Sequence, residues 1–460
     1  MDTLDNVFKA YDIRGLYPSE VDEALAWKVG HGSGQFLRSL LSGYDRGQAS
    51  ANRLVVGRDM RPHSEPLAAN LMEGILTSGL SVVDLGMVDT PMIYFAINHL
   101  GTCGGVQVTA SHNPIEYNGF KIAGQKARPV GENTGLKEIK HIASTIRRSP
   151  STGGSAKVQA MDLWEAYRKH VLQFLKLQRP LRVLADASNG MAGKMVPAVF
   201  GGTELEVLPL NFELGRGFAH APNPMLESSL AQLRTAMRQK RVDFGVCFDG
   251  DADRCVFLDE RGEPIRSDLI TALLARWFLK LYSGATVIYD LRSSRVVQEE
   301  ILASNGIPRR ERVGHAFMKK TMNDTHAVFG GELSGHYYFR ENFNADSGAI
   351  VLAVVASVVA GQNRPMSELI APLKRYVQSG ERNFRIVEKA AKVKELSEKF
   401  KDGQQDWLDG LTVNYKDWWF NVRQSNTEPL VRLNLEAKDR DVLDSKLKQI
   451  EDILGKPVDE

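Results

Sequence analysis

Three short apolar runs, far apart in the chain, each end directly in an acidic residue. They cover residues 53–59, 181–186 and 286–290. About 40 to 65 residues after each run comes a polar loop, and these loops contain Ser111, Asp249 and Glu332. Because the runs alternate with helix-like segments, the repetition predicts three copies of one α/β unit, each built on a mainly parallel or mixed sheet.

Composition indicates where these units end. Residues 148–155 are rich in Ser, Gly and Pro, which is typical of a linker, and residues 260–264 form a turn-like segment. Strand-like runs and an amphipathic tail after residue 380 predict a smaller α+β domain at the C-terminus. The predicted domains are 1–150, which carries Ser111, 155–258, 259–368 and 369–460.

Charge and cysteine content exclude several classes of protein. A net charge of +2 over 460 residues gives no electrostatic basis for binding nucleic acid. The three cysteines have neither disulfide-framework nor metal-site spacing. The first residues lack the features of a signal peptide, and the longest apolar stretch, residues 349–360, is too short to span a bilayer. We therefore expect a cytoplasmic protein that binds no membrane.

The segment 106–114 predicts an exposed serine at the end of a strand. Its apolar start reads as a buried strand, and Pro114 cannot continue a sheet ladder. Ser111 is therefore expected on a tight loop at the carboxyl edge of a sheet, where ligands collect in α/β proteins. Alone, a Ser–His pair in a loop is more often a turn with local hydrogen bonds than a catalytic pair, and neighbouring side chains tend to point apart. His112 is therefore expected to be a poor base for Ser111.

A second loop, residues 249–254, carries three aspartates at alternate positions. Asp249, Asp251 and Asp253 can converge on one hard cation through oxygen ligands, and without a cation they would repel one another. The alternative is a solvated acidic turn. An EF-hand is rejected because Arg254 occupies the loop position that requires glycine, and because strand-like runs flank the loop.

Four motifs in this order resemble the signatures of the α-D-phosphohexomutases. They are TASHNP at 109–114, DGDADR at 249–254, GELSGH at 331–336 and RQSNTEP at 423–429. The sequences YDIRG at 11–15 and SNTEP narrow the resemblance to the phosphomannomutase/phosphoglucomutase branch. The resemblance implies three related α/β/α domains with mixed sheets, plus a smaller C-terminal α+β domain, around a central cleft.

The resemblance also implies roles for the first two loops. Ser111 would carry a phosphate, and Asp249, Asp251 and Asp253 would bind Mg²⁺ together with an oxygen on Ser111. Arg254 would add positive charge or form a salt bridge to a neighbouring carboxylate, and both readings stay open. The resemblance places Lys121 and Arg14 beside the reacting hydroxyl, and either could assist proton transfer. His112 is counted with the catalytic residues. Lys121 would need a depressed pKa to accept a proton.

The remaining motifs are implied to hold the substrate. Glu332 and Ser334 would hydrogen-bond sugar hydroxyls, while His336 would either touch the sugar or brace its loop. Arg292 stands where some relatives have lysine, which leaves its contact with substrate open. The other implied substrate-binding residues are Tyr11 and His315 beside the sugar, and Arg423, Ser425, Asn426, Thr427 and the less certain Arg432 at the distal phosphate.

The implied activity is interconversion of hexose 6-phosphate and hexose 1-phosphate through phosphoserine and a hexose 1,6-bisphosphate, which would also serve as activator. The product would supply nucleotide-sugar synthesis, and the chain would act as a monomer or dimer. Phosphoglucosamine mutase and a non-catalytic sugar-phosphate-binding protein remain rivals. A serine hydrolase is rejected because Ser111 lacks the flanking glycines of a nucleophile elbow. The motifs do not rank mannose against glucose.

Overall fold

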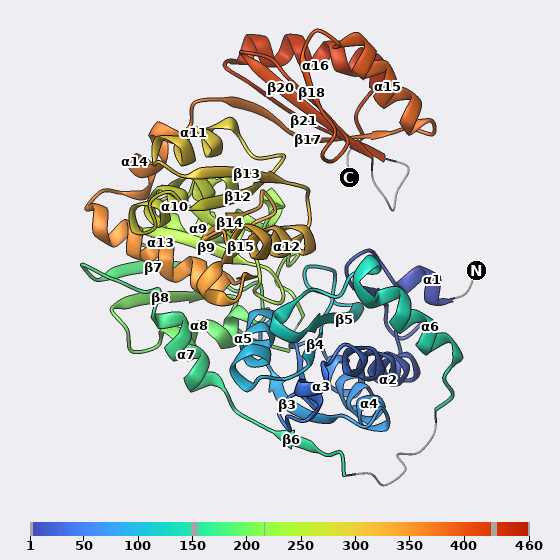
Figure 1. Ribbon diagram of the computed structural model, residues 1–460. Helices are drawn as coiled ribbons and strands as arrows, with labels where there is room; N and C mark the ends of the chain where they lie inside the picture. The colour runs from blue at the N-terminus through green and yellow to red at the C-terminus, as the bar shows by residue number, and fades with distance from the viewer. Residues whose placement is uncertain (1–2, 149–154, 216, 425–429, 459–460) are drawn as a thin grey trace.

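The computed structural model describes residues 3–148, 155–215, 217–424 and 430–458 (Figure 1). Four sheets follow one another along these parts of the chain, and each sheet is built from its own stretch of sequence. Most of the predicted linker 148–155 lies outside the described residues.

The first sheet is mixed and has six strands. The order is β1-β5-β4-β2-β3-β6, and β5 runs antiparallel to both of its neighbours while the other pairs are parallel. Its strands are β1 (Ile13–Leu16), β2 (Arg53–Arg58), β3 (Ser81–Met87), β4 (Gly104–Val108), β5 (Tyr117–Gly124) and β6 (Val158–Ala160). Its main helices are α2 (Glu23–Ser39), α4 (Ser64–Thr77), α5 (Thr90–Leu100) and α6 (Lys137–Thr145).

The second and third sheets are also mixed, with five strands each in the orders β11-β10-β9-β7-β8 and β13-β12-β14-β15-β16. The second contains β7 (Leu181–Asp186), α8 (Ala192–Phe200), β8 (Leu205–Leu210), α9 (Glu227–Gln239), β9 (Phe244–Phe248), β10 (Cys255–Leu258) and β11 (Pro264–Ile265). The third contains α10 (Ser267–Leu281), β12 (Thr286–Asp290), α11 (Arg295–Ala303), β13 (Ile307–Glu311), α12 (His315–Thr325), β14 (Phe329–Gly331), β15 (Tyr337–Phe339) and β16 (Ala345–Asp346).

The three mixed sheets share one connection pattern. In each, a first strand (β2, β7 or β12) lies between two parallel partners, and the later partner (β4, β9 or β14) turns into an antiparallel hairpin. The loops containing Ser111, Asp249 and Glu332 are the turns of these three hairpins. The predicted α/β repetition and mixed sheets are therefore confirmed.

The central strands form because their apolar residues are covered on both faces. Every residue of β4 and β9 is buried, as expected for inner strands of a sheet that is covered on both faces. One continuous apolar core includes Val55, Val183 and Val287, which lie on the first strands of the three repeats. The apolar stretch predicted at 349–360 forms α13 (Gly348–Gln362), which contacts α7 (Trp164–Leu172), α8 and α10 inside this core.

The C-terminal sheet is entirely antiparallel, in the order β17-β21-β20-β19-β18, and carries two helices. It has its own apolar core and lies at the top of the molecule in Figure 1, beside the third unit. This confirms the predicted α+β domain. Its elements are β17 (Val377–Arg385), α15 (Lys389–Lys399), β18 (Gln404–Asp406), β19 (Leu411–Asn414), β20 (Trp418–Gln424), β21 (Leu430–Ala437) and α16 (Arg440–Leu454).

Two of the predicted domain boundaries do not coincide with the ends of the sheets. The break at 258/259 falls inside the β10–β11 hairpin, because Leu258 pairs with Pro264 in the second sheet. Strand β6, placed by the sequence in the second domain, pairs with β3 and extends the first sheet to Ala160. Both strands lie at sheet edges and are very short, so their own sequences carry little signal.

Within the described ranges, no single helix is both long and apolar enough to cross a membrane. A bent pair, α13 together with residues 366–373, meets the length and composition criteria only when the two are joined across a 95° break.

Candidate active site

Ser111 lies in the β4–β5 turn, at the carboxyl end of a buried strand as the sequence predicts. Its backbone is left-handed, with φ of 50°, and its amide donates to Oγ1 of Thr109 at 2.9 Å. A left-handed serine is sparsely populated and is kept only where surrounding contacts determine it. The hydroxyl is buried and donates to Oδ2 of Asp249 at 3.2 Å.

The left-handed turn also brings His112 back toward its neighbour. Nδ1 of His112 lies 3.3 Å from Oγ of Ser111, so the expectation that the two side chains point apart is wrong. Burial, followed by the charges of Arg254, Arg14 and Lys121, holds the pKa of His112 well below its ordinary value. His112 is therefore a neutral imidazole beside the serine.

Arg61 holds the Ser111 turn together from outside the motif. Its guanidinium donates to the backbone carbonyls of Ser111 at 3.1 Å and Asn113 at 2.7 Å, and it also bonds those of Pro114 and Tyr117. Its Nε pairs with Asp59 at 3.0 Å, and both side chains are fully buried. Asp59 in turn accepts a hydrogen bond from Thr109 at 2.7 Å. One buried ion pair thus determines the shape of the turn.

Asp249, Asp251 and Asp253 converge in the β9–β10 turn. One oxygen from each lies within 4.8 Å of the others, and all three carboxylates are buried. Burial and the two neighbouring carboxylates raise the pKa of Asp249 well above its ordinary value. Oδ1 of Asp251 and Oδ1 of Asp253 have no hydrogen-bond partner among the described residues. An all-oxygen donor set with unsatisfied buried atoms fits a hard divalent cation such as Mg²⁺.

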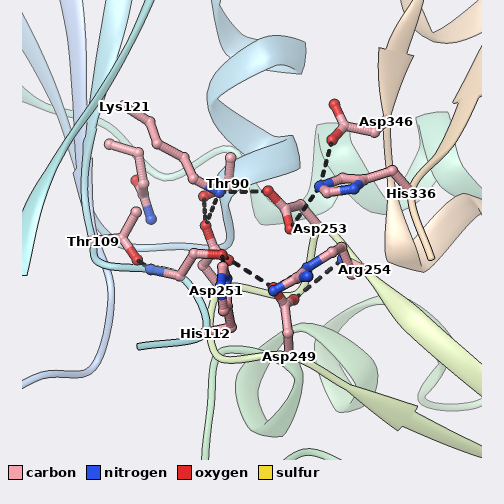
Figure 2. Close-up of polar contacts among 12 residues, drawn as sticks. Thr90, Thr109, His112, Lys121, Asp249, Asp251, Asp253, Arg254, His336 and Asp346 are labelled. Atoms are coloured by element: carbon pink, nitrogen blue, oxygen red, sulfur yellow. Dashed lines mark hydrogen bonds and ion pairs between the residues drawn. The ribbon is translucent and has the colours of Figure 1, made fainter. Parts of the chain in front are cut away.

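Lys121 and Thr90 bind this turn from the first sheet and its helix α5 (Figure 2). Nζ of Lys121 lies 2.7 Å from Asp251 and 2.6 Å from Asp253, and the Thr90 hydroxyl donates to Asp251 at 2.5 Å. Burial would lower the pKa of Lys121, but the aspartates raise it well above its ordinary value. In this arrangement Lys121 is a counter-ion of the aspartates, and its pKa shift is opposite to the depression that a proton acceptor needs.

Arg254 and Arg14 are both engaged by carboxylates. Nε of Arg254 donates to Asp249 at 3.0 Å, which is the salt bridge that the sequence left open, while its Nη2 has no partner among the described residues and is buried. Arg14 pairs with Asp12 and donates to the side chain of Asn113, in the Ser111 turn. Both guanidinium groups therefore lie at the Ser111–aspartate junction.

The Glu332 turn is bonded directly to the aspartate turn. The amide of Cys255 donates to the Gly335 carbonyl at 3.2 Å, and Arg254 and His336 form an antiparallel bridge. His336 lies 3.6 Å from Asp253 and 3.7 Å from Asp346, as Figure 2 shows, and its Nδ1 is 3.1 Å from the Ser334 hydroxyl. In these contacts His336 braces its own turn.

Glu332 is also hydrogen-bonded to the start of α12, where His315 is the first helical residue. Its carboxylate accepts from the Gly314 amide at 2.8 Å and from the Tyr338 hydroxyl at 2.7 Å. The ring of Tyr11, from the first unit, meets His315 edge-on at a centroid distance of 5.5 Å. Burial and the nearby Lys319 lower the pKa of His315 to about 3, so this imidazole is neutral.

Arg423 and Arg432 lie opposite each other on β20 and β21. Both are paired with Glu381 of β17, at 3.0 and 3.4 Å. Arg292 approaches the same carboxylate from the third unit, at 3.8 Å, while its Nη2 pairs with Asp290 at 2.6 Å. The predicted phosphate ligands Ser425, Asn426 and Thr427 lie outside the described residues.

Comparison with known proteins identifies the family. Four family models match in order: phosphoglucomutase/phosphomannomutase α/β/α domain I at residues 5–149, domain II at 165–262, domain III at 266–376 and the C-terminal domain at 381–453. The chain belongs to the phosphoglucomutase/phosphomannomutase family. The expected phosphohexomutase, an isomerase that moves a phosphoryl group, is confirmed at the level of this family.

Relatives of this phosphohexomutase cover nearly its whole length. A phosphomannomutase of Salmonella montevideo is 35% identical, covering 97% of this chain and 98% of that protein. A phosphomannomutase of Escherichia coli K12 is 35% identical over 94% of each chain. A solved structure of a phosphoglucomutase/phosphomannomutase family protein from Burkholderia thailandensis superimposes with a TM-score of 0.87, at 29% identity, covering 97% of this chain and 96% of that one.

The amino-acid sequence did not predict that several other residues contribute to this phosphohexomutase site. Asp59 directly follows β2, and Asp290 is the last residue of β12. Each accepts a hydrogen bond from the backbone amide two residues later in the chain, from Arg61 at 3.0 Å and from Arg292 at 2.9 Å. Each also accepts a hydrogen bond from the hairpin turn of its own unit. Asp59 accepts from the Thr109 hydroxyl, and Asp290 accepts from the Leu333 amide at 2.8 Å. The repeated acidic residue at a strand end was the available signal. Nothing in the sequence near Thr90 or Glu381 points to the aspartates or the arginines.

Proposed function

We propose that this protein interconverts hexose 6-phosphate and hexose 1-phosphate, with mannose or glucose phosphate as substrate, through a phosphoserine at Ser111. The observation that carries the proposal is the junction of three hairpin turns from three units. The Ser111 hydroxyl contacts the aspartate turn at 3.2 Å, and the aspartate turn is hydrogen-bonded to the Glu332 turn. A nucleophile, a cation site and a hydroxyl-binding carboxylate therefore adjoin one another, which phosphoryl transfer to a sugar requires.

The reaction consists of two phosphoryl transfers. In the first, the bond between phosphorus and Oγ of phospho-Ser111 breaks, a bond to the free sugar hydroxyl forms, and the hydroxyl proton passes to a base. The product of this step is a hexose 1,6-bisphosphate. After the bisphosphate turns around in the site, Ser111 takes back the other phosphate, and the positional isomer leaves. Added hexose 1,6-bisphosphate would restore any enzyme that has lost its phosphate.

The aspartates Asp249, Asp251 and Asp253 would hold Mg²⁺ with an oxygen of the phosphate on Ser111. When bound, the ion supplies positive charge that stabilises the transferring oxygens. When Asp251 and Asp253 bind a cation, the ammonium group of Lys121 would be displaced from these carboxylates. The ammonium group could then approach the reacting hydroxyl. The candidates for moving a proton would be His112, which contacts Ser111, Arg14, which contacts Asn113 in the Ser111 turn, and Lys121, which contacts Asp251. Arg254 adds positive charge beside Asp249.

Most of the substrate-binding residues would come from the third and fourth units, and Tyr11 would come from the first. Glu332 and Ser334 would hydrogen-bond two adjacent hydroxyls, with Tyr11, His315 and His336 completing the wall around the sugar. A carboxylate that accepts two hydroxyl protons can hold the sugar in two flipped orientations, which the mechanism demands. Arg423 and Arg432, together with Ser425, Asn426 and Thr427, would bind the phosphate that is not being transferred.

A side-by-side mutase assay tests the proposal. Mannose 1-phosphate, glucose 1-phosphate and glucosamine 1-phosphate are compared, with Mg²⁺ and a trace of hexose 1,6-bisphosphate. Turnover of the first two is the expected result, and their ratio gives the sugar preference. Activity on glucosamine 1-phosphate alone would identify the enzyme as a phosphoglucosamine mutase. No activity on any of the three sugar phosphates, together with no phosphate on Ser111, would indicate a non-catalytic binding protein. A cytoplasmic enzyme supplying nucleotide-sugar synthesis is the setting we propose for it.

A further inference from the structure

Glu381 stands at the centre of three arginines. Its carboxylate lies 3.0 Å from Arg423, 3.4 Å from Arg432 and 3.8 Å from Arg292, and Asn434 approaches it at 3.4 Å. Two arginines come from the fourth sheet, and the third comes from the loop after β12. The carboxylate is about a quarter exposed, so the cluster opens to solvent rather than forming a closed ion-pair core.

The backbone of β17 aims Glu381 at this cluster. The register of β17 against β21 shifts between Gln378 and Glu381, and Gly380 has φ of 70°. A bulge with a left-handed glycine redirects the following side chain. Arg382, the next residue, pairs with Glu451 of α16 at 3.1 Å, on the helix-covered face of the sheet. Adjacent strand residues thus point to opposite faces of the sheet, and Glu381 points to the face that carries Arg423 and Arg432.

The arginines need a counter-ion in the empty site. Arg423 and Arg432 are direct cross-strand neighbours, and like charges in that position repel each other. Burial alone would raise the pKa of Glu381, but Arg423, Arg292 and Arg432 lower it below its ordinary value, so the carboxylate is charged. Arg292 is already paired with Asp290, so Glu381 is chiefly the counter-ion of the neighbouring guanidinium groups of Arg423 and Arg432, and these two groups together are complementary to a phosphate.

We propose that Glu381 is the resident counter-ion of the distal-phosphate site, and that it weakens phosphate binding enough for the bisphosphate intermediate to leave the arginines and turn around. The inference rests on the proposed mutase function and adds a positioning residue to it. Glu381 holds the guanidinium groups near one another while the site is empty. Once phosphate is bound, the carboxylate repels it, and this repulsion offsets part of the attraction of the arginines.

We expect the repulsion between Glu381 and the bound phosphate to affect phosphate affinity more than the orienting effect of Glu381 on the arginines does. Removing the carboxylate charge relieves its repulsion of both charges of a phosphate dianion. Glutamine at the same position still offers an amide oxygen to Arg423, so much of the orienting hydrogen bond survives. Arg292 stays fixed by Asp290 whether or not Glu381 is charged. We therefore expect Glu381→Gln to bind phosphate more tightly than the natural protein.

Titration of the intact protein with inorganic phosphate, in phosphate-free buffer, measures this directly. Glu381→Gln is expected to lower the phosphate Kd about tenfold, which corresponds to ~1.4 kcal/mol. The matched control is Glu451→Gln, which removes the same charge from the other face of the same domain and should leave Kd unchanged. Adding Arg423→Ala to Glu381→Gln should abolish the gain. Glu381→Ala removes the same charge and provides a second test should the glutamine variant fail to fold.

Three outcomes would overturn the proposal. Unchanged or weaker phosphate binding by both Glu381 variants would mean that the carboxylate only orients the arginines. A gain that survives Arg423→Ala would place the extra phosphate elsewhere, and an equal gain in Glu451→Gln would make the effect one of net charge.

Turnover provides an independent readout. With hexose 1-phosphate as substrate, Glu381→Gln should lower KM and kcat together, because a phosphate held more tightly is released more slowly. A rise in KM would contradict the counter-ion role. If the natural protein has no mutase activity, the proposed function fails, whereas the phosphate titration still decides the role of Glu381.

Discussion

The hydroxyl of Ser111 and the carboxylate of Asp249 meet at 3.2 Å although they are 138 positions apart in the chain. The contact joins the hairpin turns of the first and second sheets. Because both residues are buried, the two turns must be positioned to within fractions of an ångström for the contact to form. The proposed phosphoryl transfer and its cation site depend on this junction.

Replacing Ser111 tests the covalent mechanism. Ser111→Ala should remove nearly all turnover, because it removes the oxygen on which the phosphoserine would form. The fold should persist, since the change deletes one atom. Turnover, phosphate incorporation and circular dichroism are the measurements, with Ser144→Ala on the exposed face of α6 as the control. An alanine enzyme with full activity would refute a phosphoserine intermediate.

Replacing Asp251 tests the cation site. Asp251→Ala should lower activity at least about 100-fold and raise the Mg²⁺ concentration needed for half-maximal rate, because one of three oxygen ligands is lost. Titrating Mg²⁺ into enzyme stripped of metal gives both values. Asp444→Ala, which removes an exposed carboxylate on α16, should change neither. If the Mg²⁺ dependence of Asp251→Ala matches the natural enzyme, the assignment is wrong.

Arg61 should control kcat without touching substrate. Arg61→Lys keeps the charge but cannot bond Asp59 and several carbonyls of the Ser111 turn at once. A misplaced nucleophile costs rate rather than affinity, so kcat should fall about 100-fold while KM stays within about threefold.

The Asp59–Arg61 ion pair should also matter for stability. Arg61→Ala leaves Asp59 buried without its partner and should destabilise the protein by ~3–5 kcal/mol. Thermal unfolding measures the loss, and Arg440→Ala, in an exposed ion pair on α16, is the control. Unchanged kcat in Arg61→Lys together with an unchanged melting temperature in Arg61→Ala would contradict the anchoring role.

His220 should make stability depend on pH. Burial lowers its pKa, but its bonds to Asp186 at 3.0 Å and to the Ala221 carbonyl at 2.9 Å raise the pKa above the ordinary 6.5 overall. The charged form is favoured by folding, so this contribution is complete below about pH 6.5 and is lost as pH rises through the folded pKa. The melting-temperature advantage of the natural protein over His220→Gln should therefore shrink between pH 6 and 9. An advantage that grows with pH, or an equal trend in the exposed His141→Gln, would contradict this.

Much of the architecture and of the local chemistry could be predicted from the amino-acid sequence. Alternating apolar runs and helix-like segments predicted three α/β units, because burial on both faces leaves a continuous apolar run in each central strand. Pro114 predicted where the strand before Ser111 gives way to a turn. These signals are local, since a strand end and a turn are encoded by a few adjacent residues.

Tertiary structure alone decided which of these turns meet. Arg61 bonds a turn some 50 positions away, Thr90 reaches Asp251 over 161 positions, and His112 faces Ser111 only because the serine is left-handed. Arg292 and Glu381 meet because the third and fourth units lie side by side. Contacts between residues so far apart in the chain depend on how whole sheets and helices pack together. A short stretch of sequence does not predict that packing. The sequence therefore predicted which residues belong to the turns, but not which residues from other parts of the chain they contact.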